Sequence, residues 1–225
     1  ATIALNTSGA GLNRRGYRDL SAQAPLRETL AAAMVMLAHY RGGEVLYDPC
    51  CGSGTIAIEV AMIAAGVAPG LQRKFAFDAW DAYSADAAQE RERALALRKE
   101  SGFPHIEASD IDPKMVSMAR RHAKRAGVNG YINFSEKDAL AFSPDTEKGV
   151  VVTNPPYGQR LDKQAGLDIA KALGAFKRSH PQYGLFVLSG DDEFSRSFGG
   201  KPDKRRKLYN GNKRCDLYMY FRKNR

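Results

Sequence analysis

The segment LYDPCCGSGTIAIEVA, residues 46–61, constrains the fold more than any other stretch of the chain. A short apolar run ends in an acid, a glycine loop follows, and a helical apolar pattern begins at Thr55. Glycines let the backbone approach a ligand closely, and the free amides at a helix start attract an anion. The segment therefore predicts the first strand, loop and helix of a parallel α/β sheet, with room for a ligand beside the loop.

Strand and helix patterns alternate along most of the chain. Apolar runs predict strands at 44–48, 105–110, 131–138, 149–154 and 184–190. Helical spacing predicts helices at 55–65, 113–126 and 164–179. This alternation predicts a doubly wound parallel sheet, and Asn210-Gly211 between two β-rich runs predicts an antiparallel hairpin at the end. We therefore expect a Rossmann-like α/β fold whose seven-stranded mixed sheet closes with that hairpin.

The N-terminal region, residues 1–40, is expected to be a small extension packed on the main domain, residues 41–225. It alternates and turns at Gly9 and Gly11, which predicts a short hairpin, and a helix begins near Pro25.

Residues 66–104 interrupt the strand–helix alternation. They contain the aromatic patch FAFDAW and a charged helix near 84–101. No linker composition flanks them, so we expect a helical insertion within the domain.

Composition bears on partners and location. The 225 residues, 44% of them hydrophobic, suit one globular domain with a small appendage. A net charge of +9 favours a polyanionic partner, nucleic acid first, although a basic solvated surface would have the same charge. Three cysteines, two of them adjacent, cannot form a disulfide framework and indicate a reducing, cytoplasmic setting. The apolar run at 30–38 is too short to cross a membrane.

Acids at strand ends bear on which ligand the glycine loop takes. A dinucleotide would need an acid about 20 residues on, where Asp78 lies in a poor strand pattern. Asp110 ends a much better strand and could accept both ribose hydroxyls of an S-adenosylmethionine, while Asp48 orients its amino-acid end. A glycine turn with no ligand is the third interpretation.

Other residues near these strand ends fit an adenosine. Ile111 can lie on the adenine face, and Asp138 at the next strand end can receive the adenine amino group. Taken by itself, Asp138 would be interpreted as a surface loop acid. Asp112 before Pro113 is expected to cap the following helix. Three acids at three successive strand ends favour a ligand at the carboxyl edge of the sheet.

The fourth strand ends in the sequence TNPPYG, residues 153–158. The exocyclic amine of a nucleobase is a poor nucleophile, because its lone pair is conjugated into the ring. The Asn154 side-chain oxygen and the Pro155 carbonyl can accept its hydrogens, Pro156 stiffens the loop, and Tyr157 offers a ring on which an extruded base can stack. Catalysis would then rest on positioning, without a strong base. A rigid Pro-Pro turn with an aromatic lid is the alternative.

Taken together, DPCCGSGTIAIEVAMIAAGVAPG, ASDIDPKM and TNPPYGQRL resemble the bacterial rRNA guanine-N2 methyltransferases of the RlmL type. The N-terminal LNRRGYRD and APLRETLAA resemble the start of their catalytic domain, and the resemblance extends from about Ile3 to Phe221. It implies a class I methyltransferase that uses S-adenosylmethionine to methylate N2 of a guanosine in large-subunit (23S) rRNA. The NPPY sequence alone is shared with DNA adenine and protein glutamine methyltransferases.

The resemblance also implies roles for single residues. Asn154 to Tyr157 would form the catalytic loop, and the segment around Pro25 and Leu26 would close over the methionine end of the cofactor. The implied cofactor contacts are Pro25, Leu26, Asp48, Pro49, Gly52, Ser53, Gly54, Thr55, Asp110, Ile111, Asp138, Ala139 and Asn154. Such proteins carry an RNA-binding THUMP module before this domain, so we expect a catalytic fragment of a longer protein.

Basic residues give candidate RNA contacts at Arg15, Arg18 and Arg160, while the basic segments at 201–207 and 211–214 either contact phosphates or are simply solvated. Histidine and cysteine spacings match no metal site, and we expect no metal.

Three other functions stay open. A tRNA guanine-N2 or DNA adenine-N6 methyltransferase would use the same loop. A non-catalytic RNA-binding module is disfavoured by the intact glycine loop and Asn154, and an oxidoreductase by the strand-end acids.

Overall fold

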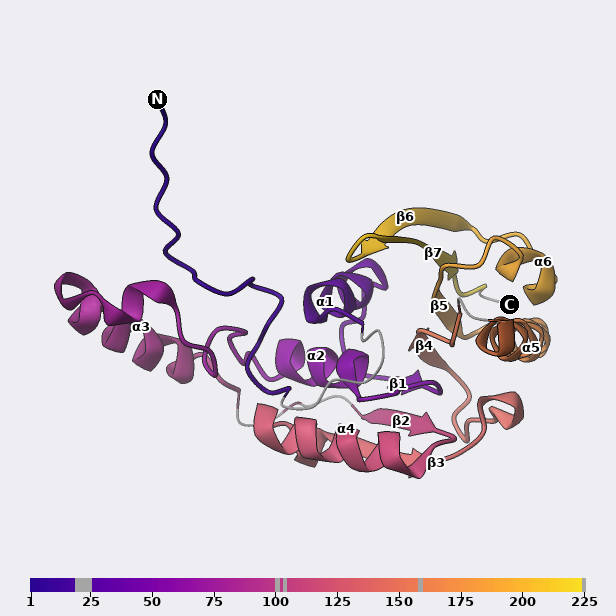
Figure 1. Ribbon diagram of the computed structural model, residues 1–225. Helices are drawn as coiled ribbons and strands as arrows, with labels where there is room; N and C mark the ends of the chain where they lie inside the picture. The colour runs from indigo at the N-terminus through magenta and orange to yellow at the C-terminus, as the bar shows by residue number, and fades with distance from the viewer. Residues whose placement is uncertain (19–25, 100–101, 103–104, 158–159, 224–225) are drawn as a thin grey trace.

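The computed structural model describes residues 1–18, 26–99, 102, 105–157 and 160–223. Its centre is a seven-stranded sheet in the order β3-β2-β1-β4-β5-β7-β6 (Figure 1). The strands are β1 (Val45–Asp48), β2 (Ile106–Asp110), β3 (Ile132–Glu136), β4 (Gly149–Thr153), β5 (Gly184–Ser189), β6 (Lys204–Asn210) and β7 (Lys213–Tyr220). Strands β1 to β5 are parallel, and β7 runs antiparallel to β5 and β6. The predicted mixed sheet with its C-terminal hairpin is confirmed.

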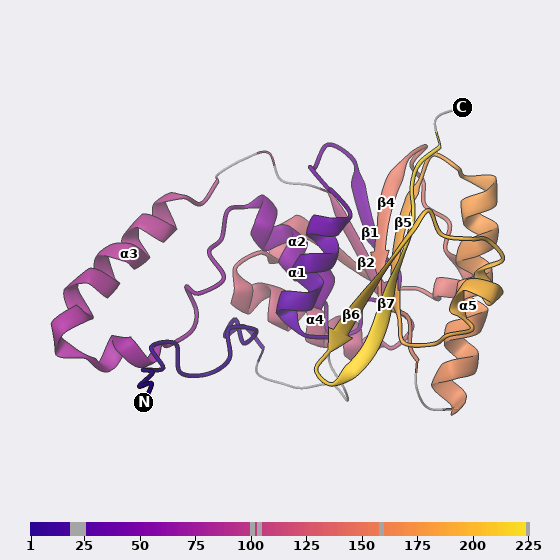
Figure 2. The same ribbon diagram turned by 90° about the horizontal axis from the view of Figure 1, so that it is seen from above.

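Helices cover both faces of the sheet (Figure 2). On one face lie α1 (Glu28–Leu37), α2 (Thr55–Ala64) and α4 (Pro113–Ala126), and on the other α5 (Arg160–Ser179) and α6 (Phe194–Phe198). Strands β4 and β5 are buried along their whole lengths, which explains their continuous apolar sequences. Short 3-10 turns lie at Ala76–Ala79, Asp81–Tyr83, Asn129–Tyr131 and Ala139–Ala141.

The local signals that predicted these boundaries are visible. Asp112 caps α4 by accepting the Lys114 amide hydrogen at 2.8 Å, with Pro113 in the first turn, as predicted. Gly211 adopts φ +66° in the turn between β6 and β7, the left-handed conformation that the hairpin prediction required.

The insertion carries helix α3 (Ser84–Ala96), which stands away from the sheet beside the N-terminal segment (Figure 2). The Arg73 guanidinium joins the insertion to the N-terminal segment by donating hydrogen bonds to four carbonyl oxygens of that segment. The four acceptors are Ser8, Ala10, Gly11 and Arg14.

The predicted N-terminal hairpin is wrong, because residues 1–18 contain no strand. Asn6 accepts hydrogen bonds from the Ser8 and Gly9 amides in a side-chain turn, and Arg73 takes carbonyls that a strand partner would have used. Tyr17 nevertheless reaches the core, where its hydroxyl donates to Glu59 of α2 at 3.3 Å and its ring lies 6.4 Å from that of His122 of α4.

Candidate active site

The strand order reverses between β1 and β4, and this point gathers the predicted site residues. β1 pairs with β2 on one side and β4 on the other, all parallel. Asp48 ends β1, Asp110 ends β2, and Asn154 directly follows β4. In open α/β sheets, ligands bind at such a switch point, beyond the carboxyl ends of the strands.

Asp48 is the buried acid of the site. Its side chain is 1% exposed, and its Oδ1 accepts hydrogen bonds from the Thr153 hydroxyl at 2.8 Å and the Cys50 amide at 3.4 Å. Its Oδ2 has no hydrogen-bond partner among the residues that the structure describes. Burial raises the pKa of Asp48 to about 7, although the bonds from Thr153 and Cys50 oppose the rise. A buried carboxylate oxygen without a donor suits a cationic group of a ligand.

The glycine loop is shaped by two left-handed residues. Gly52 has φ +51°, with open space where a side chain would stand, and its amide donates to Asp110 Oδ2 at 2.9 Å. Gly54, at φ +83°, lies so close to α4 that a Cβ would meet the Ala119 methyl at 2.9 Å. The loop therefore presents bare backbone to the site, while Ser53 and Thr55 are buried beneath it.

Asp110 and its neighbours form the second part of the site. The Asp110 Oδ1 accepts the Asp112 amide hydrogen at 3.0 Å, so its carboxylate is fixed from two sides. Ile111 beside it is 65% exposed, an apolar side chain without cover. Asp138 is exposed and accepts the Leu140 amide hydrogen at 2.9 Å, while the adjacent Ala139 is buried. Both Pro49 and Asp138 line a cavity of about 260 Å³.

The predicted catalytic loop leaves β4 in the sequence Asn154-Pro155-Pro156-Tyr157. Asn154 is half-buried, and its Oδ1 has no hydrogen-bond partner within the described part of the chain. Pro155 is buried and Pro156 exposed. A Cβ at Gly166 of α5 would overlap the Pro156 carbonyl oxygen, so this glycine lets the loop lie directly on the helix.

The Tyr157 ring is held between two residues that the sequence analysis did not single out. Gly190 lies under it, where a Cβ would be 2.8 Å from the ring carbons, and the Lys213 ammonium lies 4.4 Å from the ring centroid. The Tyr157 hydroxyl is 3.2 Å from Cys215 Sγ. Burial raises the pKa of Tyr157, and the neighbouring Cys215 thiol raises it further. On the ring face that Lys213 covers, a stacked base would take the place of the ammonium.

Comparison with known proteins identifies this arrangement. Residues 15–219 match the family described as RMKL-like, methyltransferase domain. The chain belongs to this family. It is 38% identical over 99% of its length to a putative RNA methyltransferase, YpsC, of Bacillus subtilis. It is 40% identical over 97% of its length to a ribosomal RNA large subunit methyltransferase K/L of Shewanella baltica. The chain spans 58% of the former protein and 32% of the latter.

Solved structures of related proteins are similar to the chain. The putative methyltransferase SMU.472, crystallised with SAH, has a TM-score of 0.89 and 35% identity over 97% of this chain and 58% of its own. A predicted N6-adenine-specific DNA methylase from Listeria monocytogenes has a TM-score of 0.89 and 38% identity over 96% of this chain and 57% of its own. The fold is that of the Rossmann-like methyltransferases, and the cofactor of this methyltransferase domain is S-adenosylmethionine.

The site of this methyltransferase fits that cofactor. The unpartnered Oδ2 of Asp48 suits an amino group, and the open backbone at Gly52 leaves space for a ligand. The fixed Asp110 carboxylate and exposed Ile111 suit a ribose and an adenine face. Leu26 is buried against the α1–α2 core, and Pro25 lies outside the described residues.

Two of the predicted RNA contacts, Arg15 and Arg18, have partners within the protein. The Arg15 side chain pairs with Glu59 at 3.3 Å, and the Arg18 side chain donates to the Thr55 hydroxyl at 2.6 Å and lies 3.6 Å from Glu28. Both guanidinium groups are turned into the protein, because buried acids on α1 and α2 require partners. Arg160 begins α5, and its side chain lies outside the described residues.

Cys50 and Cys51 are poorly suited to nucleophilic catalysis. Burial raises the pKa of both thiols, so neither is a thiolate nucleophile at neutral pH. No group of three His, Cys, Asp or Glu residues that could hold a metal occurs in the described part of the chain. Within the same part, no helix has the length and apolar character needed to span a membrane.

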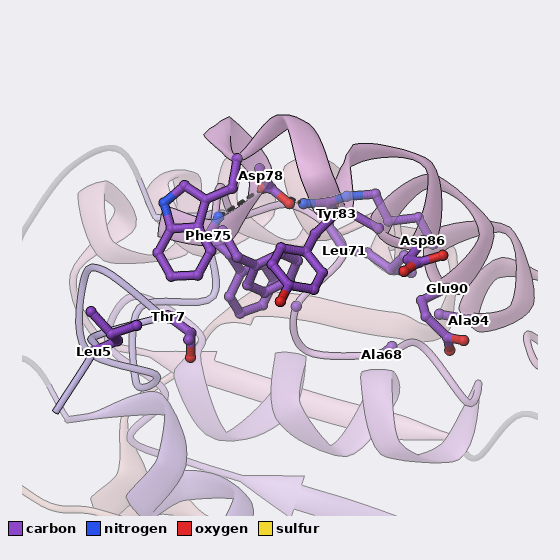
Figure 3. Close-up of a pocket in the computed structure, with 15 residues that line it drawn as sticks. Leu5, Thr7, Ala68, Leu71, Phe75, Asp78, Tyr83, Asp86, Glu90 and Ala94 are labelled. Carbon is purple, nitrogen blue, oxygen red and sulfur yellow. Dashed lines mark hydrogen bonds and ion pairs between the residues drawn. The ribbon is translucent and has the colours of Figure 1, made fainter.

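A second cavity, of about 530 Å³, lies in the insertion (Figure 3). Leu5, Leu71, Phe75 and Tyr83 contribute to its apolar wall. None of its lining residues belongs to the predicted site, so this cavity and the strand-end site are separate features.

Proposed function

We propose that this domain transfers a methyl group from S-adenosylmethionine to the exocyclic N2 amine of a guanosine, in large-subunit rRNA. The observation that carries the proposal is the pair of unpartnered oxygens at adjacent strand ends, Asp48 Oδ2 and Asn154 Oδ1, among the described residues. The first suits the amino group of the cofactor, and the second suits a substrate amine. The family and the net charge of +9 support an RNA substrate.

The residues of the chain divide the work as follows. Asp48, Asp110 and the Gly52 backbone hold and orient the cofactor, which supplies an electrophilic methyl group on its sulfonium. Asn154 Oδ1 and the Pro155 carbonyl accept hydrogen bonds from the two amine hydrogens of the guanine. These bonds draw the nitrogen lone pair out of conjugation with the ring and aim it at the methyl group.

Tyr157 receives the base after extrusion from its strand. Its ring is already fixed by Gly190 and Cys215, so stacking costs little ordering of the protein. The product amine loses its proton to solvent after transfer, and the site therefore needs no strong base.

Recognition of one particular RNA is proposed to require more than this domain. The relatives are longer than the chain, and a THUMP-like RNA-binding module elsewhere in the full-length protein would supply that selectivity.

The test gives the full-length protein radiolabelled S-adenosylmethionine with unmodified large-subunit rRNA, tRNA or a DNA duplex, and identifies the modified nucleoside by mass spectrometry. The proposal expects N2-methylguanosine in the large-subunit rRNA alone. The main competing function is DNA adenine-N6 methylation, favoured by the description of the Listeria relative. N6-methyladenine in the DNA, or N2-methylguanosine confined to tRNA, would overturn the rRNA assignment.

A further inference from the structure

The C-terminal hairpin, β6 and β7, carries cations on both of its faces, and one face also carries an acid that pairs with two of its cations. Asp216 pairs with Arg205 at 2.6 Å and with Arg214 at 3.6 Å. The Arg205 guanidinium also lies 5.4 Å from the centroid of Tyr218, a member of the core beneath α5 and α6. Lys207 stands opposite Asp216 in the ladder and belongs to this same face.

The other face leaves its cations without acids. Lys204 stands opposite Met219 and Arg206 opposite Leu217, two residues of the core shared with α1 and α2. Lys213 continues the same row at the end of the hairpin. All three are exposed, and none forms an ion pair with any residue placed by the structure.

This row of cations ends at the catalytic loop. The Lys213 ammonium covers the Tyr157 ring at 4.4 Å, and the Tyr157 hydroxyl meets Cys215 on the same face of β7. On the other side of the turn, Asn210 Oδ1 accepts the Arg27 amide hydrogen at 3.2 Å. The end of the hairpin therefore joins the catalytic loop to the start of α1.

The contact between Lys213 and Tyr157 can be exchanged for a substrate contact. Stacking of a nucleobase on an aromatic ring is stronger than an exposed cation–π contact, so an arriving base displaces the ammonium. The lysine stem is flexible, and its displaced charge stays within reach of the phosphates that flank the base.

We propose that the row Lys204, Arg206 and Lys213 binds the backbone of single-stranded RNA and leads it to Tyr157, with Lys213 at a phosphate beside the target nucleotide. This inference rests on the proposed function, because it takes Tyr157 as the platform for the base.

The experiment compares neighbouring substitutions that remove the same charge from opposite faces. Lys213→Gln is paired with Arg214→Gln, and Arg206→Gln with Lys207→Gln. Binding of a fluorescent single-stranded fragment of large-subunit rRNA is measured by polarisation over a range of salt concentrations. S-adenosylhomocysteine affinity is measured for each variant as a check on the fold and the cofactor site.

We expect Lys213→Gln and Arg206→Gln each to weaken RNA binding about fivefold and to lower the salt slope by about 0.7, the value for one contact to a single strand. Arg214→Gln and Lys207→Gln should leave both quantities near those of the wild type. Equal losses on the two faces, or no loss on either, would overturn the proposal. RNA binding is measured without methyl transfer, so the two proposals can fail separately. A wild type that binds RNA through this row but methylates only DNA would refute the proposed function and leave the RNA-binding row supported.

Discussion

The strand-end site and the insertion differ in how their polar atoms are satisfied. In the insertion, the two terminal nitrogens of Arg73 donate to four carbonyls, while its Nε has no partner among the described residues, and Arg91 donates to the Leu71 and Arg73 carbonyls and to Asp78. In the site, Asp48 and Asn154 each keep a buried oxygen with no partner among the described residues. Buried polar groups in folded proteins are almost always bonded, so the difference separates a region built for stability from one built for ligands.

The largest expected effect comes from removing the oxygen of Asn154. Asn154→Ala should lower the rate of methyl transfer about 1,000-fold, since loss of one positioned acceptor in an active site costs that order. S-adenosylhomocysteine affinity should stay nearly unchanged. Single-turnover kinetics with saturating cofactor measure the first quantity, and calorimetry measures the second. Asn212→Ala, in the exposed hairpin turn, is the control. A variant at position 154 that transfers methyl groups at the normal rate would refute the mechanism.

The insertion should respond in stability instead. Arg73→Ala leaves four carbonyls of the N-terminal segment without their donor and should lower the free energy of unfolding by about 3 kcal/mol. Urea denaturation measures it, with the exposed neighbour Lys74→Ala as control. The Arg73→Ala variant should retain its rate of methyl transfer per folded molecule. A loss of methyl transfer without a loss of stability would contradict the contrast between the two regions.

Two acids only two residues apart sharpen the comparison within the site itself. Asp110→Ala should weaken S-adenosylhomocysteine binding about 30-fold, because it removes the proposed ribose acceptor and frees the Gly52 amide. Asp112→Ala should cost about 1 kcal/mol of stability through loss of the α4 cap, with little change in cofactor affinity. Calorimetry and thermal denaturation separate the two effects. The role assigned to Asp110 fails if both variants bind the cofactor equally well.

The smallest effect, per pH unit, is a pH dependence of cofactor binding. Burial raises the pKa of Asp48 to about 7, so below that pH the free protein carries a protonated carboxyl that must lose its proton to meet a cationic amino group. Affinity for S-adenosylhomocysteine should therefore rise about tenfold per pH unit up to about pH 7 and then level off. Asp48→Asn should bind weakly at all pH values without this rise. An identical pH profile in the two proteins would exclude Asp48 as the titrating group.

Signals carried by neighbouring residues predicted much of this molecule. The Asp112 cap and the Asn210-Gly211 turn form through contacts within a few residues, and the strand–glycine–helix segment is marked by consecutive residues. The structure has all three where the sequence placed them. Helix α5 begins at Arg160, four residues before its predicted start.

What the sequence could not supply was pairing over long distances. Nothing in the sequence near Asn6 indicates that Arg73 will donate hydrogen bonds to the carbonyls of the N-terminal segment. The hairpin prediction was wrong for this reason. Likewise, nothing near Arg15 or Arg18 indicates the buried acids that they neutralise. Gly190 and Lys213 became visible as site residues only when the sheet order brought them to Tyr157.

The run of four cations in β6 has one more consequence. This strand is one edge of the sheet, and its unpaired backbone groups could accept a strand from another copy. Lys204 to Lys207 would set like charges against one another in any such pairing, so repulsion keeps free molecules from joining edge to edge. Removing charges from residues 204–207 also weakens this protection, so loss of charge in β6 should favour aggregation.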